Sequence, residues 1–156
     1  ARTTGGIIGD KFGHKGGLKG RVKWLFIAIL IEGIMLMIFS RMTVLPLAIG
    51  SLIIFSLFTQ MSEGATFSVV PFINKHALGS VSGIVGAGGN MGAVAAGFLF
   101  KGGYTWPAAL LILGILVILA SFATFFVTFS SEDEAEAAEE HELALRRRAE
   151  LRAQHA

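Results

Sequence analysis

The apolar stretch from residue 79 to residue 100 constrains the fold more than any other part of the sequence. As a helix rising about 1.5 Å per residue, it is long enough to cross a bilayer. It contains seven glycines, and each would disfavour a helix in water by roughly 1 kcal/mol. In lipid no water is present to satisfy the backbone groups, so the segment stays helical. A glycine-rich stretch of this length therefore indicates a membrane helix.

The rest of the chain supports the same class. Of its residues 53% are hydrophobic and 20 are glycine, and the mean hydropathy is +0.68. These values predict an all-α membrane protein. Because the chain begins with Ala and its first residues read as the end of a helix, we expect the C-terminal piece of a longer protein. The expected helical segments are about 1–9, 22–40, 44–73, 79–100 and 105–129, followed by a charged tail at 131–156.

Charge sets the expected orientation. Residues 10–23 hold five lysines and arginines, whereas the later connections are poor in basic residues. The positive-inside rule then places residues 10–23 and the tail in the cytoplasm, with the helices in a plasma or inner membrane. The tail is acidic first and basic last, which suits a helix dipole, and Ser131 to Glu134 matches a capping box. We expect a solvated helix, with a partner-binding tail as the alternative.

Three charged side chains stand within or beside apolar segments, where they are costly and face a partner, water or a ligand. Glu32 lies in the span 22–40, and Glu63 lies beside Gln60 and Ser62 in the next. Arg2 lies near the start, and its planar guanidinium can bind a planar anion through paired hydrogen bonds. A snorkelling or terminal arginine is the alternative for Arg2. Glu63 is a candidate proton site, a partner for a basic group, or a structural polar residue.

The glycine-rich segment also carries an amide, Asn90. Small residues recur at a spacing of four, as in Gly88 and Gly92, and such ridges let neighbouring helices approach closely. Ordinary helix packing explains the spacing alone. The amide among the glycines also fits the close approach of something small and polar.

The sequence contains no pattern typical of an enzyme. It has no cysteine, no metal-ligand spacing, no catalytic grouping and no phosphate-binding turn after a strand. We therefore expect no enzymatic activity, no metal, no cofactor and no nucleic-acid partner. The lipid bilayer is the partner that the composition itself indicates.

Two motifs resemble those of one known family. The segment Gly-Ala-Gly-Gly-Asn-Met-Gly at 86–92 resembles the nitrate signature of the nitrate/nitrite porter family in the major facilitator superfamily. The segment Gly-Ile-Ile-Gly-Asp-Lys-Phe-Gly-His-Lys at 6–15 resembles the superfamily's loop motif between helices, although His14 stands where arginine is commoner. The resemblance implies the C-terminal part of a major facilitator fold, from the end of helix 8 through helix 12.

The resemblance also implies a function, which is transport of nitrate and/or nitrite by alternating access. It implies uptake by proton symport or by nitrate/nitrite exchange, with the other half of the site in a missing N-terminal half. A carrier of another small solute, or a non-transporting membrane scaffold or sensor, is the alternative. The implied substrate-binding residues are Arg2, Gly88, Gly89, Asn90 and Gly92, and the implied conformational latch comprises Gly6, Asp10, Lys11 and Gly13.

Overall fold

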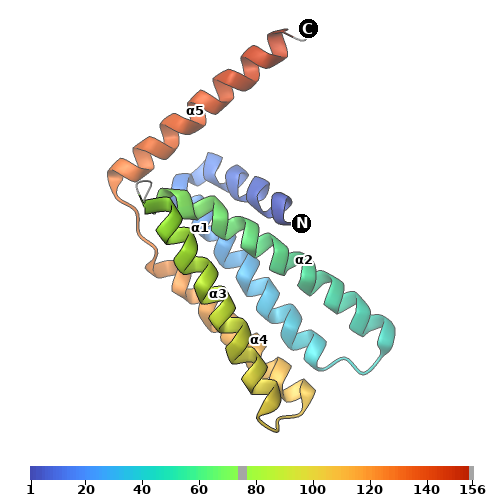
Figure 1. The fold of residues 1–156 in the computed structure, drawn as a ribbon. Helices are drawn as coiled ribbons and strands as arrows, with labels where there is room; N and C mark the ends of the chain where they lie inside the picture. The colour runs from blue at the N-terminus through green and yellow to red at the C-terminus, as the bar shows by residue number, and fades with distance from the viewer. Residues whose placement is uncertain (74–76, 155–156) are drawn as a thin grey trace.

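The computed structural model describes residues 1–73 and 77–154 and is built from helices (Figure 1). No strand is present among these residues, and four helices are long and apolar enough to cross a membrane. The expectation of an all-α, multi-pass membrane protein is confirmed. The expected tail runs to residue 156, and its last two residues lie outside the described part. The elements are α1 (Arg2–Ser40), α2 (Leu45–Val69), η1 (Val70–Phe72), α3 (Leu78–Lys101), α4 (Trp106–Phe122), η3 (Ala123–Phe126) and α5 (Ser131–Gln154).

Helix α1 consists of two helices joined by a kink at Gly16 and Gly17. Both residues have non-helical backbone angles, and Gly17 has φ +60° and ψ −149°, a conformation that only glycine adopts without strain. We call residues 2–15 the N-terminal arm and residues 18–40 the C-terminal arm. The sequence motif suggested a loop beginning near residue 10. The structure instead keeps this segment helical up to the double glycine, where the backbone can turn.

Glycines explain why the N-terminal arm can lie so close to α2. Gly5, Gly9 and Gly13 follow one another at a spacing of four, so they share one face of the helix. A Cβ on Gly5 would meet the backbone of Met61 in α2, and a Cβ on Gly9 would lie 2.9 Å from the Ser68 hydroxyl. The arm therefore lies directly on α2, with backbone against backbone.

Proline and serine mark other helix ends. Pro46 lies in the first turn of α2, where its missing N–H costs nothing, and Pro71 lies in the 3-10 turn that follows Val69. The capping box of α5 forms one residue earlier than the sequence predicted. The Ser130 N–H donates to Asp133 Oδ2 at 2.9 Å, and the Asp133 N–H donates to Ser130 Oγ at 3.1 Å.

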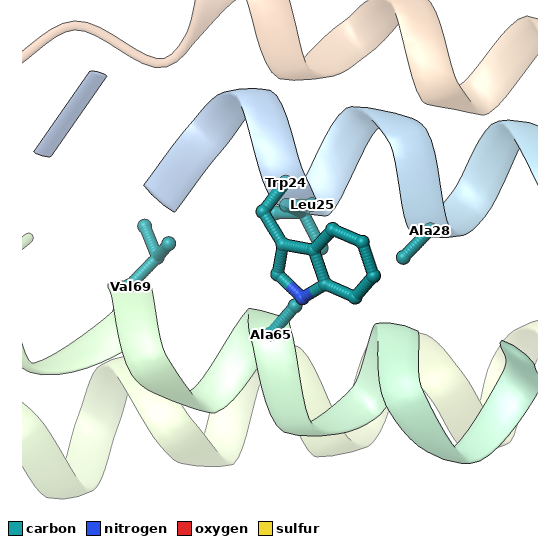
Figure 2. Packing of buried hydrophobic residues seen from close by; sticks show 5 residues of the cluster. All are labelled: Trp24, Leu25, Ala28, Ala65 and Val69. Atoms are coloured by element: carbon teal, nitrogen blue, oxygen red, sulfur yellow. The ribbon is translucent and has the colours of Figure 1, made fainter. Parts of the chain in front are cut away.

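The packed core lies between the C-terminal arm of α1 and α2. Figure 2 shows the indole of Trp24 between the two helices, with Leu25, Ala28, Ala65 and Val69 around it. The indole N–H donates to the Gly5 carbonyl at 2.9 Å, so this one side chain joins both arms of α1 to α2. In a membrane, where lipid competes for apolar contact, such close packing and hydrogen bonding hold helices together.

Helix α4 packs along the C-terminal arm, from the contact between Phe26 and Phe122 to a pair of glycines, Gly33 and Gly114. A Cβ on Gly33 of α1 would lie 3.0 Å from the Gly114 carbonyl of α4, and the reverse distance is also 3.0 Å. Because neither residue has a side chain, the two backbones can approach each other. The C-terminal arm thus has α2 on one side and α4 on another.

Among the four described helices that are able to cross a membrane, α3 differs from the other three because none of its residues is buried. For each of its seven glycines, nothing lies within 4 Å of the position that a Cβ would take. The close packing expected for this glycine ridge is therefore not made among the described residues. The glycines that do pack closely here are on α1, α2 and α4, and the role of the α3 ridge stays a prediction.

The kink of α1 and the start of α5 lie at the same end of the bundle, at the top of Figure 1. An ion pair of 3.4 Å joins Lys19 Nζ beside the kink to Glu134 Oε1 in the first turn of α5. The sequence-based expectation that residues 10–23 share one side with the tail agrees with this arrangement.

Candidate functional site

The structure brings together two of the predicted site residues, Arg2 and Glu63. The Arg2 NH2 atom lies 3.3 Å from Glu63 Oε1, and the Arg2 Cζ atom lies 5.0 Å from the centroid of the Phe67 ring. Glu63 and Phe67 are one helical turn apart on α2, so they present a carboxylate and a ring on the same face. Both charged side chains are about half exposed, at 54% and 44%. The guanidinium has further N–H donors besides the nitrogen that faces Glu63.

Close backbone packing positions Arg2. A Cβ on Gly64 of α2 would meet the Arg2 carbonyl oxygen, and a Cβ on Gly5 would meet the Met61 carbonyl oxygen. The first turn of α1 thus lies against α2 at the residue next to Glu63. This contact explains how a short stretch of helix holds its arginine beside the carboxylate.

The signature residues of α3 are not brought to this pair. Asn90 and its neighbours Gly88, Gly89 and Gly92 are exposed, and α3 has its main contacts with α4 and η1. Within the described residues, no hydrogen bond joins Asn90 to Arg2 or Glu63. The predicted binding role of these four residues stays a prediction.

Asp10, which the family resemblance implies is part of a latch, forms an ion pair across the kink of α1. Arg21 NH2 lies 3.1 Å from Asp10 Oδ1. Arg21 NH1 also donates to the Ser68 carbonyl at 2.8 Å, and Arg21 Cζ lies 4.8 Å from the Phe72 ring centroid. We call these four residues the Arg21 clasp. It joins both arms of α1 to the end of α2 and to η1.

The other predicted latch residues lie around this clasp or beside α2. Gly13 faces Arg21, since a Cβ there would lie 2.9 Å from Arg21 Nε. Gly6 lies beside α2, and a Cβ added there would be 3.8 Å from the Gly64 carbonyl oxygen, which is an ordinary van der Waals contact. Lys11 is exposed. Whether these residues act as a latch is not tested by the structure and stays a prediction.

Sequence reasoning missed Arg21, which it treated as one of several basic residues at the membrane boundary. The Arg21 side chain is only 17% exposed. The available signal was the double glycine at 16–17, because a turn between two helices brings together residues on either side of it. Asp10 and Arg21 flank that turn.

Glu32 has a hydrogen-bond partner across the α1–α2 contact. The Ser62 hydroxyl lies 2.7 Å from Glu32 Oε2, closer than the 2.9 Å to the Thr59 carbonyl of its own helix. Ser62 is 8% exposed. An intramembrane carboxylate needs such a donor because water is scarce around it.

We expect Ser62→Ala to destabilise the folded protein by about 1–3 kcal/mol, because it leaves the Glu32 carboxyl without this donor. Ser51→Ala is the matched control, since Ser51 is a buried serine on the same helix that donates to the Ala48 carbonyl of its own helix. Thermal denaturation of the purified protein in detergent measures both. Equal losses for the two variants would show that the Glu32 contact contributes nothing.

Among residues 1–73 and 77–154, no group of three or more histidines, aspartates and glutamates is placed to hold a metal ion. The arrangement that the structure does offer is electrostatic, namely a half-exposed guanidinium beside a carboxylate and a ring. It can bind an anion and exchange one partner for another.

Comparison with known proteins finds relatives that are named as nitrate or nitrate/nitrite transporters. The chain is 35% identical to high affinity nitrate transporter 2.5 of Arabidopsis thaliana over 83% of its own length and 26% of that protein's. It is 35% identical to nitrate transporter 2.2 of Chlamydomonas reinhardtii over 83% of its length and 27% of the relative's. It is 32% identical to the nitrate/nitrite transporter NrtP of Nostoc punctiforme over 89% of its length and 28% of the relative's.

The chain spans about a quarter of the length of these curated relatives. No family model matches it, and no solved structure does. The relatives are named as transporters, and the similarity extends over most of this chain. The chain therefore belongs to the nitrate/nitrite porter family of the major facilitator superfamily.

Proposed function

We propose that this chain is the C-terminal part of a secondary transporter that carries nitrate and/or nitrite across a cell membrane by alternating access. The similarity to named nitrate transporters supports the substrate. The Arg2–Glu63 pair, with an N–O distance of 3.3 Å, is the observation that supports a site in this chain. The remainder of the site belongs to an N-terminal half outside this chain.

Arg2 is the residue that binds the anion in this proposal. Nitrate is planar with its charge spread over three oxygens, and a guanidinium presents parallel N–H donors that match two of them. In the structure one terminal nitrogen faces Glu63, and the Phe67 ring lies near the guanidinium. An arriving anion therefore competes with the Glu63 carboxylate for the same cation.

This competition offers a route for coupling to protons. A proton bound by Glu63 neutralises the carboxylate and leaves Arg2 free to pair with nitrate, so one proton and one anion would enter the site together. Glu63 would return to Arg2 after both have left. In exchange of nitrate for nitrite, by contrast, one anion replaces another on Arg2 and Glu63 needs no proton.

The glycine-rich helix and the kink of α1 would serve alternating access. Asn90, with Gly88, Gly89 and Gly92 beside it, would meet the substrate and the missing half through the exposed face of α3. Asp10, held by Arg21 in this structure, would close the end of the transporter at which residues 10–23 and the tail lie. By the distribution of basic residues that end is cytoplasmic, and the membrane is a plasma or inner membrane.

The test is uptake of labelled nitrate by the full-length transporter with Arg2→Lys. Lysine keeps the charge but loses the planar fork, so we expect uptake at low nitrate to fall roughly tenfold or more. Arg41→Lys is the control, because Arg41 is exposed just beyond the last residue of α1 and should tolerate the change. Normal uptake by a well-expressed Arg2→Lys protein would refute the anion site. If another anion inhibits the uptake of labelled nitrate more strongly than unlabelled nitrate does, that anion is the better substrate.

Glu63→Gln in the same assay separates the coupling modes. If protons are co-transported, the variant should transport nitrate with little dependence on external pH and should lose uphill accumulation. If nitrate is exchanged for nitrite, vesicles loaded with nitrite should still drive uptake by the variant at the wild-type rate.

A further inference from the structure

A groove lies beside the C-terminal arm of α1, where the chain between α4 and α5 passes it. It encloses about 510 Å³, which is within the range of small-molecule sites. Its walls combine two cations with aromatic side chains, and neither feature is used by the proposed transport site. The groove is lined by Lys19, Lys23, Phe26 and Phe125, among others.

The groove opens on the side of α1 that faces away from α2. Lys19, Lys23 and Phe26 are spaced four and three residues apart, so they share one face of the helix. Trp24 and Ala28, which pack on α2, lie on the opposite face by the same periodicity. The groove is therefore at the edge of the packed bundle and not inside it.

The two lysines give one end of the groove a positive charge. Lys23 is exposed, and in the part of the chain that the structure describes no carboxylate is paired with it. Lys19 pairs with Glu134 of α5 at 3.4 Å, with its own side chain 79% exposed. An exposed pair of this kind is weak, so both ammonium groups remain available to another anion.

Phenylalanines form the other end. The ring of Phe26 lies 4.9 Å from that of Phe125 and 5.6 Å from that of Phe122. Phe125 is nevertheless 64% exposed. Lys19 and Phe26 are about 10 Å apart along the helix axis. This spacing compares with a headgroup layer of roughly 5–8 Å on each side of the hydrocarbon core.

We propose that the groove binds an anionic phospholipid, with its phosphate between Lys19 and Lys23 and an acyl chain along Phe26 and Phe125. A small soluble anion would use the lysines alone and gain nothing from the rings, whereas a phospholipid uses both ends. Basic pockets of this kind at the cytoplasmic boundary of membrane helices suit anionic headgroups. The proposal depends on the helices spanning a membrane and not on the identity of the transported substrate.

Helix α5 competes with the lipid for the same cation. Glu134 is a carboxylate that belongs to the chain, and it occupies Lys19 in the absence of another anion. Arrival of the phosphate releases Glu134, so lipid binding and attachment of the tail oppose each other. This competition predicts opposite effects of substitutions at the lysines and at Glu134.

The experiment counts lipids retained by the purified full-length protein, by native mass spectrometry after incubation with phosphatidylglycerol or phosphatidylcholine. We expect Lys19→Gln with Lys23→Gln to reduce phosphatidylglycerol retention about tenfold to thirtyfold and to leave phosphatidylcholine unchanged. The matched control is Arg146→Gln with Arg147→Gln, which removes the same charge from exposed positions of α5 outside the groove. It should retain phosphatidylglycerol as the wild type does.

A third variant tests the competition. Glu134→Gln should raise phosphatidylglycerol retention by about twofold to fivefold, because the internal competitor is lost. Equal losses in the two double variants would overturn the proposal in favour of general attraction between basic protein and acidic lipid. Displacement of phosphatidylglycerol by glycerol phosphate or by nitrate at equal concentration would also overturn it, because the acyl chain would then contribute nothing.

Discussion

Replacing Gly5 by alanine is expected to destabilise the protein severely, whereas the same change at the adjacent Gly6 is expected to be tolerated. The Cβ added at Gly5 meets the backbone of Met61, while the Cβ added at Gly6 finds the Gly64 carbonyl at 3.8 Å. A backbone neighbour cannot rotate away as a side chain can. Overpacking of this kind typically costs 1–3 kcal/mol and occasionally more, and here it separates the first turns of α1 from α2.

The two substitutions form a matched pair because they lie side by side in one helix. Both gain the same helix propensity, roughly 1 kcal/mol, so the difference between them measures packing against α2. Monodispersity and thermal denaturation in detergent report the difference. A Gly5→Ala protein as stable as Gly6→Ala would show that the N-terminal arm does not lie on α2 as described.

Removing Arg21 is the second change from which we expect a large effect. Arg21→Gln loses the ion pair to Asp10, the hydrogen bond to the Ser68 carbonyl and the contact with the Phe72 ring. Hydrogen bonds to charged groups contribute about 1.5–3 kcal/mol, and this guanidinium is largely shielded from water. Asp10→Asn should lower the stability by less, because Arg21 then keeps its hydrogen bond to the Ser68 carbonyl and its contact with the Phe72 ring.

Lys15→Gln is the control for Arg21→Gln, since Lys15 is an exposed cation just before the kink. Thermal denaturation ranks the variants, and we expect Arg21→Gln to lose most, Asp10→Asn less and Lys15→Gln little. The chain has no cysteine, so a single introduced cysteine beside the kink can also report opening of the clasp. If Asp10→Asn and Arg21→Gln cost the same, the ion pair alone matters and the clasp is wrong.

The fold class could be predicted because it depends on the length and hydrophobicity of segments, which can be read directly from the sequence. Apolar length and the bilayer thickness together require spanning helices. The capping box was placed one residue late since Ser130 and Ser131 are adjacent and each has an acid three residues on. Local rules do not choose between two such candidates.

The kink and the close glycine contacts were harder to predict, for a physical reason. A helix in lipid tolerates glycine anywhere, so the positions of glycines do not reveal which of them touch another backbone. The sequence drew attention to the ridge on α3, while the contacts formed at Gly5, Gly64 and Gly114 depend on which helices become neighbours. That is decided by the whole fold.

The sequence predicted the individual residues of the candidate site but not that Arg2 and Glu63 would form an ion pair. Arg2 and Glu63 were each conspicuous as charges in apolar surroundings, but 60 residues of sequence lie between them. Only the crossing of the N-terminal arm over α2 joins them. Arg21 was overlooked because its charge has the sign expected at that membrane boundary, and only the double glycine at 16–17 pointed to its pairing with Asp10.

The lack of buried residues on α3 bears on how the protein is made. Of the four helices able to cross a membrane, α3 is the least apolar and α4 the most, and only a short turn from Gly102 to Thr105 separates them. During synthesis the translocon tests each segment for its preference for lipid, and packing inside this chain, which buries no residue of α3, contributes little to holding that helix. The strongly apolar α4 then secures α3 in the membrane as the second helix of one hairpin, although the glycines of α3 have no close neighbour within the described residues.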